Sequence, residues 1–225
     1  MKTIRLGAKG PNVSQFGIGA MSFAGIYGDA TVKESHAVLN DCRAAGVTHI
    51  DTANVYGKGR SEEIIGSWFA DTPGARNDMV LATKAAITGD AERPFNNDPD
   101  YLESCLDASL KRLGVDHVDL FYVHRFDRAH SPEDLAGTLA KLIDSGKTRA
   151  VGLSEIAPAT LRRAWTECPI AAVQSEYSLS TRAPELGLVQ TCAELDTTLV
   201  AFSPLGRAFL TDAPFSYDRA QSMAF

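Results

Sequence analysis

Strand-like runs alternate with helix-like segments along the whole sequence, and this alternation restricts the possible folds more than any other feature. The strand-like runs are short and rich in β-branched residues, and they span Gln15–Ile18, Thr48–Asp51, Val80–Lys84, Val118–His124, Ala150–Ser154, Ala172–Glu176 and Thr198–Phe202. The amphipathic segments between them span Thr31–Ala45, Ser61–Phe69, Asp100–Leu113, Pro132–Ser145, Pro158–Thr166 and Pro184–Leu195. This order predicts an α/β fold, in which right-handed helical crossovers join the strands of a parallel sheet.

Local signals mark several helix ends. Ser131 followed by Pro132 is typical of an N-cap with proline in the first turn, and Ser61 followed by two glutamates indicates another helix start. Glycines that can adopt the left-handed conformation follow three of the helices, at Gly46, Gly114 and Gly146. The spacing of Leu102, Leu106, Leu110 and Leu113 predicts one apolar stripe facing the core.

The glycine pattern favours a barrel over a doubly wound sheet. A dinucleotide-binding sheet requires G-x-G-x-x-G after its first strand, but the stretch that begins at Gly17 has Ser22 in place of the third glycine. Seven strand-like runs without a change in composition therefore predict a (β/α)8 barrel of the TIM type. Ahead of them, Ile4–Leu6 and Val13–Gln15 predict a hairpin at about residues 3–15 that closes the lower mouth of the barrel.

The number of strands does not complete that barrel. A closed barrel has eight strands and typically about 250 residues, whereas this sequence shows seven strand-like runs and then a loop-like tail to Phe225. We therefore expect one incomplete barrel domain over residues 1–225 that lacks the eighth βα unit and the C-terminal segment. Such a barrel would expose the edges of its first and seventh strands.

Composition excludes several classes of function. The net charge is −6, which disfavours nucleic acid as a partner. No stretch approaches the roughly 18 apolar residues of a membrane span, and the N-terminus has no signal-peptide core. The four widely spaced cysteines form no C-x-x-C pair and are expected to be buried thiols of a cytoplasmic protein; they are Cys42, Cys105, Cys168 and Cys192.

Polar residues follow the strand-like runs at the ends where chemistry occurs in a parallel barrel. Asp51, Lys84 and His124 each end a run, and Tyr56 lies in the short loop after Asp51. Further polar residues at such ends are Ser154, Glu155, Gln174, Glu176 and Ser203. Because the carboxyl ends of parallel strands meet at one mouth, these side chains are expected to converge there.

Those residue types suit proton transfer to a carbonyl oxygen. The stem of Lys84 follows an apolar run and is expected to be buried, with Asp51 on the adjacent strand as its partner. An ammonium near a phenol lowers its pKa from about 10, and an imidazole can donate a hydrogen bond to the substrate oxygen. Taken singly, Asp51 is also compatible with a helix cap, and His124 with a core histidine.

Other chemistries find less support in the sequence. Asp116, His117 and Asp119 lie close together, but within a strand only alternate side chains share a face, and we expect no metal site. No G-x-S-x-G motif occurs, which disfavours a hydrolase triad.

The sequence resembles the aldo-keto reductase superfamily from about residue 3 to residue 211. The matching stretches are Gly46–Ala53, Tyr56–Gly57, Ser61–Gly66, Thr83–Lys84, Ser109–Gly114, Asp119–Arg125, Gly146–Ser154 and Phe202–Gly206. The resemblance implies a catalytic tetrad of Asp51, Tyr56, Lys84 and His124. Glu155 stands where many members have asparagine, and the branch that acts on aldehydes and related small carbonyls often carries this glutamate.

The resemblance also implies a cofactor site for NADPH or NADP⁺ across the barrel mouth. Ser154 and Gln174 would hold the carboxamide, Phe202 would stack on the nicotinamide, and the pyrophosphate would meet the loop after Phe202. The cofactor-binding residues implied in full are Gly19, Ala20, Met21, Asp51, Ser154, Glu155, Gln174, Phe202, Ser203, Pro204, Leu205, Gly206 and Arg207. The substrate-lining residues are Phe23, Tyr27, Tyr56, His124 and Arg125.

The expected function is therefore an oxidoreductase that reduces aldehydes or ketones to alcohols, with Tyr56 as the proton donor. A small-molecule carbonyl compound is the expected partner, without nucleic acid or membrane. In the family, the residues that select NADPH over NADH lie beyond the position of Phe225. Two alternatives stay open: a non-catalytic NADP(H)-binding sensor or subunit, and an inactive truncated reductase.

Overall fold

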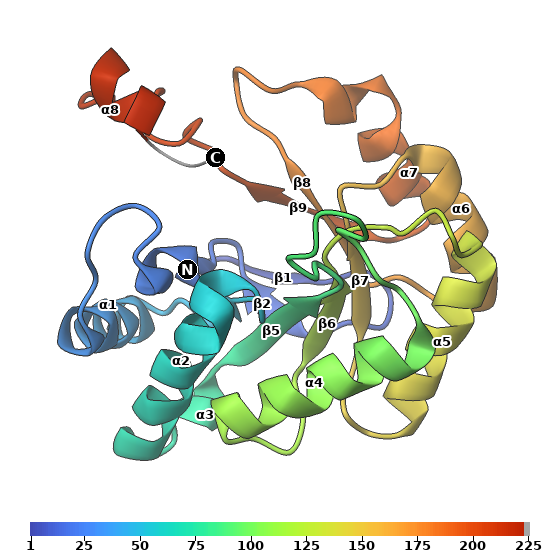
Figure 1. Ribbon diagram of the computed structural model, residues 1–225, viewed down its shortest axis with the longest axis horizontal. Coiled ribbons are helices and arrows are strands. Elements are labelled where there is room, and N and C mark those ends of the chain that lie inside the picture. The colour runs from blue at the N-terminus through green and yellow to red at the C-terminus, as the bar shows by residue number, and fades with distance from the viewer. Residues whose placement is uncertain (223–225) are drawn as a thin grey trace.

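Seven parallel strands form one sheet in the computed structural model, which describes residues 1–222 (Figure 1). The last three residues of the expected domain, 223–225, lie outside the described residues. Each strand pairs with the next along the chain, in the order β3 (Ile18–Gly19), β4 (His49–Asp51), β5 (Val80–Ala85), β6 (Leu120–Val123), β7 (Val151–Ser154), β8 (Ala172–Glu176) and β9 (Thr198–Phe202). This sequential order confirms the barrel type and contradicts a doubly wound sheet.

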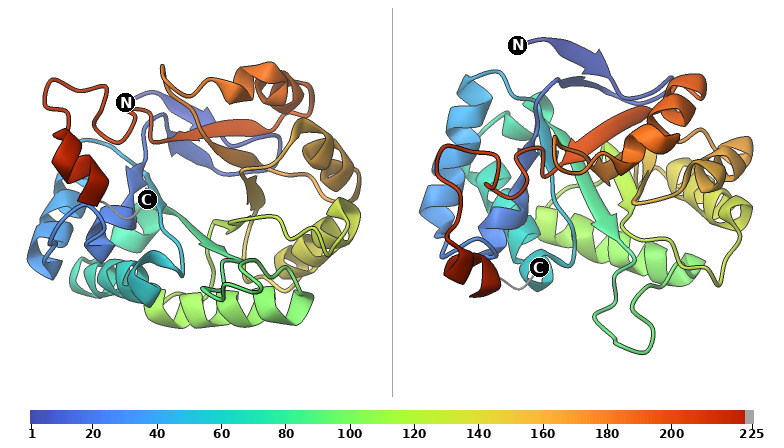
Figure 2. Two further views of the ribbon diagram at one scale, coloured as in Figure 1. Left: turned by 45° about the horizontal axis from the view of Figure 1, so that its top comes forward. Right: turned by 90° about the horizontal axis from the view of Figure 1, so that it is seen from above.

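The sheet curls around an interior, and the helices cover its outer face (Figure 2). They are α1 (Val32–Ala44), α2 (Arg60–Asp71), α3 (Ala75–Asp78), α4 (Pro99–Leu113), α5 (Pro132–Asp144), α6 (Pro158–Glu167) and α7 (Leu188–Glu194). The short helix α8 (Tyr217–Ser222) lies apart from the sheet in Figure 1. Among residues 1–222, β3 pairs only with β4 and β9 only with β8, so the curled sheet forms an incomplete barrel with two open edges. None of the helices in this part of the chain is long and apolar enough to span a bilayer.

Several predicted elements have different bounds in the structure. The first strand covers Ile18–Gly19 rather than Gln15–Ile18, because residues 12–14 pair in another sheet and a bend separates the two. The fourth strand begins at Leu120, two residues later than predicted. The helix predicted over Pro184–Leu195 is broken at Gly187, whose φ of 133° no helix accommodates; a 3₁₀ helix, η3 (Ala183–Leu186), precedes the break.

The predicted helix ends are only partly correct. Ser131 caps α5, since its side chain accepts a hydrogen bond from the Asp134 backbone N–H, and Gly114 ends α4 in the left-handed region with φ of 65°. The helix predicted to start at Ser61 begins one residue earlier, at Arg60, and its N-cap is Gly59 rather than a serine. The Ser61 hydroxyl is instead buried and donates to the Ala20 carbonyl at 2.8 Å.

The N-terminal residues form an antiparallel hairpin of β1 (Thr3–Arg5) and β2 (Asn12–Ser14). Leu6 and Val13 are buried against the inward-facing residues Ala82, Leu120 and Ala172. The Gly7 backbone N–H donates to the Thr198 hydroxyl at 2.9 Å, at the beginning of β9. The hairpin therefore fills the end of the barrel opposite to the carboxyl ends of the strands.

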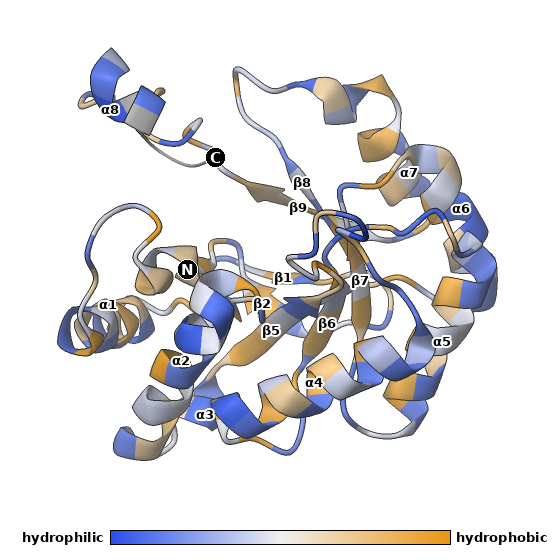
Figure 3. Cartoon of the chain, in the orientation of Figure 1, coloured by the Kyte–Doolittle hydropathy of each residue, from blue (hydrophilic) through white to orange (hydrophobic). Residues whose placement is uncertain are grey.

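The larger apolar core lies between the sheet and the helices. In Figure 3 the strands are mostly coloured as hydrophobic, whereas the helices carry bands of both colours. Leu102, Leu106 and Leu113 of α4 are fully buried there, as predicted, and Leu110 is partly buried. Of the four cysteines, Cys168 and Cys192 are buried but Cys42 and Cys105 are only half-buried, which corrects the expectation that all four are buried.

Gly152, on β7, occupies a position where the inside of the barrel has no room for a side chain. A Cβ there would lie 2.4 Å from the Tyr122 ring and 2.8 Å from the Ala172 carbonyl oxygen. Gly152→Ala is therefore expected to lower the free energy of unfolding by about 1–3 kcal/mol in urea denaturation. Gly137→Ala, in α5, meets nothing within 4 Å and is expected to raise it by about 0.5–1 kcal/mol. Equal effects of the two substitutions would contradict this account of Gly152.

Candidate active site

The carboxyl ends of the strands surround a cavity of about 450 Å³. Its walls come from the strand ends and from the loops that follow β3, β4, β5, β6 and β9. The lining residues are Gly19, Met21, Ile26, Tyr27, Asp51, Val55, Tyr56, Ile87, His124, Arg125, Ser154, Gln174, Phe202, Ser203 and Arg207. Most of the polar residues that the sequence places at strand ends therefore face one shared space.

Lys84 is at the centre of the polar contacts below this cavity. Its side chain is fully buried near the end of β5, and its ammonium forms an ion pair with Asp51 at the end of β4. The same Nζ donates to the Thr52 carbonyl oxygen at 2.9 Å and lies 3.5 Å from the Tyr56 Oη. Tyr56 begins the short 3₁₀ segment η2 (Tyr56–Gly59), in which Gly57 and Lys58 have positive φ values of 60° and 55°, and Tyr56 lines the cavity. The predicted pairing of Lys84 with Asp51 is correct.

Electrostatics keep Lys84 charged despite its burial. Burial by itself would lower the pKa of this ammonium, but the charges and hydrogen bonds of Asp51 and Tyr56 outweigh that effect and raise the pKa above its usual value. Asp51 in turn accepts a second hydrogen bond, from the Gln174 Nε2 at 2.9 Å. The carboxylate is therefore held between two donors, and it fixes the position of the ammonium beside the phenol.

His124 follows β6 directly and presents a neutral imidazole to the cavity. Its backbone N–H donates to the Ala85 carbonyl at 2.7 Å, which keeps the residue in line with the strand, and its ring lies edge-on to Tyr56 with the centroids 5.9 Å apart. Burial, Lys84 and Arg125 together lower the pKa of His124 from 6.5 to about 2. The buried Nδ1 has no hydrogen-bond partner among residues 1–222. A neutral ring of this kind can donate one hydrogen bond to a substrate oxygen.

The low pKa of His124 predicts a loss of stability in acid. An unfolded histidine takes up a proton near pH 6.5 but the folded one does not, so the stabilisation is complete above that pH and is lost as pH falls toward 2. In His124→Gln, the slope of unfolding free energy against pH should be smaller by up to about 1.4 kcal/mol per pH unit below pH 6. Urea denaturation between pH 4.5 and 7 measures both slopes, and parallel curves would contradict the prediction.

Comparison with known proteins identifies a family for this chain. Residues 15–223 match the sequence profile described as "Aldo/keto reductase family". The chain belongs to the aldo/keto reductase family. Its relatives include the aldo-keto reductase yakc [NADP(+)] of Schizosaccharomyces pombe, 43% identical over 212 residues, and the aldo-keto reductase str7 of Strobilurus tenacellus, 45% identical over 208 residues. These matches cover 92% and 88% of this chain but 62% and 60% of the relatives, so the chain spans about three fifths of their length.

Solved structures of aldo/keto reductases share the fold. A glycerol dehydrogenase from Gluconobacter oxydans superposes with a TM-score of 0.83 at 27% identity, covering 96% of this chain and 69% of that one. A thermostable aldo-keto reductase in complex with the inhibitor epalrestat gives a TM-score of 0.81 at 32% identity, covering 94% and 76%. The seven strands described here therefore correspond to the greater part of a complete aldo/keto reductase barrel.

The residues expected to bind the cofactor of an aldo/keto reductase are divided between the cavity and its surroundings. Those that line the cavity are Gly19, Met21, Asp51, Ser154, Gln174, Phe202, Ser203 and Arg207. Ala20, Glu155, Pro204, Leu205 and Gly206 do not line it. Ala20 is fully buried in the core, and the Glu155 carboxylate instead accepts the Glu176 backbone N–H at 2.7 Å. Ser203, Gly206 and Arg207 have positive φ values of 49°, 56° and 55°, which makes the loop after β9 a tight turn at the rim.

The residues expected to bind the substrate also need one correction. Tyr27, Tyr56, His124 and Arg125 line the cavity, but Phe23 does not. Phe23 is 3% exposed and packs in the core, because the 3₁₀ helix η1 (Ala20–Ala24) after β3 turns it away from the cavity. Three apolar lining residues were not predicted: Ile26, Val55 and Ile87. Val55 directly precedes Tyr56 and Ile87 lies three residues after Lys84, so their position in the sequence was a usable signal.

Proposed function

We propose that this chain carries the catalytic site of an NADP(H)-linked reductase that converts aldehydes or ketones to alcohols, with Tyr56 as the proton donor. One observation carries the proposal. The Lys84 ammonium forms an ion pair with Asp51, and its Nζ lies 3.5 Å from the Tyr56 Oη. Asp51 and Tyr56 both line the cavity. A buried cation, its counter-ion and a phenol in this order form a proton-donating unit.

Each side chain has a distinct part in the proposed reaction. The neutral imidazole of His124 donates a hydrogen bond to the substrate carbonyl oxygen and orients it toward Tyr56. The Tyr56 Oη gives its proton to that oxygen as negative charge develops there. The positive charge of Lys84 stabilises the phenolate that remains, and Asp51 keeps the ammonium in place. Gln174 holds the second carboxylate oxygen of Asp51.

The cavity suits a nicotinamide dinucleotide. It combines an aromatic side chain, Phe202, with the hydroxyl of Ser154 and the amide of Gln174, and Arg207 lies where the loop after β9 reaches the rim. An aromatic face and amide partners fit a nicotinamide ring, and an arginine fits a phosphate. When bound, NADPH supplies the hydride for the carbonyl carbon. The printed name of the fission-yeast relative includes NADP(+), which supports this choice of cofactor.

Binding and turnover test the proposal together. The purified chain is titrated with NADPH while nicotinamide fluorescence is followed, and it is then mixed with NADPH and 4-nitrobenzaldehyde while the nicotinamide absorbance band is recorded. We expect saturable binding and a loss of absorbance that depends on the aldehyde. Tight binding without turnover would contradict the reductase and favour a nucleotide sensor. The absence of binding would contradict the cofactor site. We further propose a cytoplasmic location, which the four free thiols support.

A further inference from the structure

Arg125 is a cation on the cavity wall that the reaction outlined above does not use. It follows His124 directly, is half-buried, and lines the same cavity as Tyr56. Its Nη1 donates to the His124 carbonyl oxygen at 2.6 Å and to the Ser154 hydroxyl at 3.3 Å, both of them uncharged acceptors. In the part of the chain that the structure describes, Arg125 forms no ion pair.

Three carboxylates of this region are already paired with other cations. Asp51 is paired with Lys84, and Glu176 accepts from the Arg207 Nη2 at 3.1 Å. Asp127, two residues along the chain, lies 3.5 Å from the Arg93 Nη2 and accepts the Ala129 backbone N–H at 3.0 Å. A partly desolvated guanidinium therefore faces the cavity without a counter-charge from these residues, an arrangement that favours an anionic ligand.

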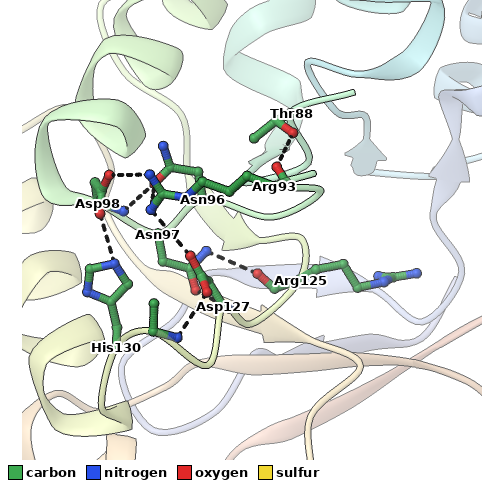
Figure 4. Close-up of polar contacts among 9 residues, drawn as sticks. Thr88, Arg93, Asn96, Asn97, Asp98, Arg125, Asp127 and His130 are labelled. Atoms are coloured by element: carbon green, nitrogen blue, oxygen red, sulfur yellow. Dashed lines mark hydrogen bonds and ion pairs between the residues drawn. The ribbon is translucent and has the colours of Figure 1, made fainter. Parts of the chain in front are cut away.

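A network of polar contacts fixes the backbone that carries Arg125 (Figure 4). Asn97 is 1% exposed; its Nδ2 donates to the Arg125 carbonyl oxygen at 3.1 Å, and its Oδ1 accepts the Asp127 backbone N–H at 2.7 Å. Arg93 pairs with Asp98 at 3.0 Å within the loop after β5, and its Nη2 lies 3.5 Å from the Asp127 carboxylate in the loop after β6, which ties the two loops together. In Figure 4 the guanidinium of Arg125 points away from this network. The position of the cation is therefore held by the fold.

We propose that Arg125 binds an anionic group on the substrate, so that this site selects carbonyl compounds bearing a carboxylate. This inference rests on the proposed reductase function and specifies its substrate class as aldehyde or keto acids. The apolar walls formed by Ile26, Val55 and Ile87 would contact the hydrocarbon part of such a molecule. A guanidinium can hold a carboxylate through two parallel hydrogen bonds, which fixes orientation as well as affinity.

A pair of substrates that differ in charge and by one methyl group tests the inference. Reduction of 4-formylbenzoate and of its neutral methyl ester is measured with NADPH, and the ratio of the two kcat/KM values gives the preference for the anion. We expect a preference for 4-formylbenzoate that falls roughly 10- to 100-fold in Arg125→Met, mainly through KM, and is partly retained in Arg125→Lys. Arg149→Met removes the same charge at the opposite end of the barrel, near Asp119, and should leave the ratio unchanged.

Calorimetry separates this inference from the proposed function. Binding of 4-formylbenzoate to the chain without nucleotide should be measurable in the wild type and lost in Arg125→Met. If neither aldehyde is reduced, the reductase proposal fails, and the calorimetric result alone decides on the anion site. If both aldehydes are reduced but the ratio is the same in the wild type and in Arg125→Met, the reductase stands and the assignment of Arg125 is wrong.

Discussion

Replacing Tyr56 with phenylalanine is expected to lower kcat for carbonyl reduction by roughly 10²- to 10⁴-fold. The substitution removes a single oxygen atom, the one that lies 3.5 Å from the Lys84 Nζ. The imidazole of His124 would remain to polarise the carbonyl but, being neutral with a pKa of about 2, it is a poor source of a proton for the developing alkoxide. The affinity for NADPH should change little, because the remaining cofactor-facing residues are untouched.

Steady-state assays and NADPH titrations on the same preparation measure both effects. Tyr101→Phe is the matched control, since it removes a phenol oxygen from the first turns of α4, outside the cavity. Turnover in Tyr56→Phe within a few-fold of the control would show that another group donates the proton. A large loss of NADPH affinity in Tyr56→Phe would instead assign the tyrosine a role in cofactor binding.

Lys84→Met is expected to cut turnover by roughly a hundredfold or more. Methionine fills the same buried volume but removes the positive charge that would stabilise a Tyr56 phenolate. It also leaves the Asp51 carboxylate with the Gln174 amide as its remaining side-chain partner, at a cost of up to about 3 kcal/mol of unfolding free energy. Asp51 borders the cavity, so water can replace part of the lost interaction, and we expect the variant to fold.

Thermal unfolding followed by circular dichroism establishes whether Lys84→Met is folded at the assay temperature. Lys147→Met is its control, because Lys147 pairs with Glu103 and Asp107 away from the cavity. Near-normal turnover of folded Lys84→Met would reject the role assigned to the lysine. Rescue of turnover in Lys84→Arg, by contrast, would show that the site needs a positive charge rather than the particular geometry of an ammonium.

The order of the elements was predictable because it depends on local patterns. β-Branched runs and amphipathic segments alternate, and each pattern reflects which side chains must be buried in that element alone. The two failures have different causes, one a pairing partner in space and the other a local backbone conformation. Gln15 and Phe16 have strand-like composition but follow a strand of the N-terminal hairpin, and the helix expected over Pro184–Leu195 is interrupted by the backbone of Gly187.

The sequence also predicted most of the candidate site. Asp51, Lys84 and His124 could be selected because strand ends of a parallel barrel converge, and the partner of a buried lysine could be sought on the adjacent strand. The position of Phe23 was not predictable, because the 3₁₀ helix after β3 decides which way that ring turns. The hydrogen bond from Gln174 to Asp51 joins residues 123 positions apart, and no spacing rule indicates it.

The sequence by itself thus determined the class of fold, the family and the identity of the four central polar residues, since these follow from periodicity, strand ends and motifs. Only the tertiary structure decided what surrounds them. Burial determines that His124 is neutral. Contacts between distant segments determine that Arg125 forms no ion pair among residues 1–222 and that Asn97 donates a hydrogen bond to its backbone carbonyl. Free energies of desolvation and pairing depend on positions in space, and those positions exist only once the sheet has curled.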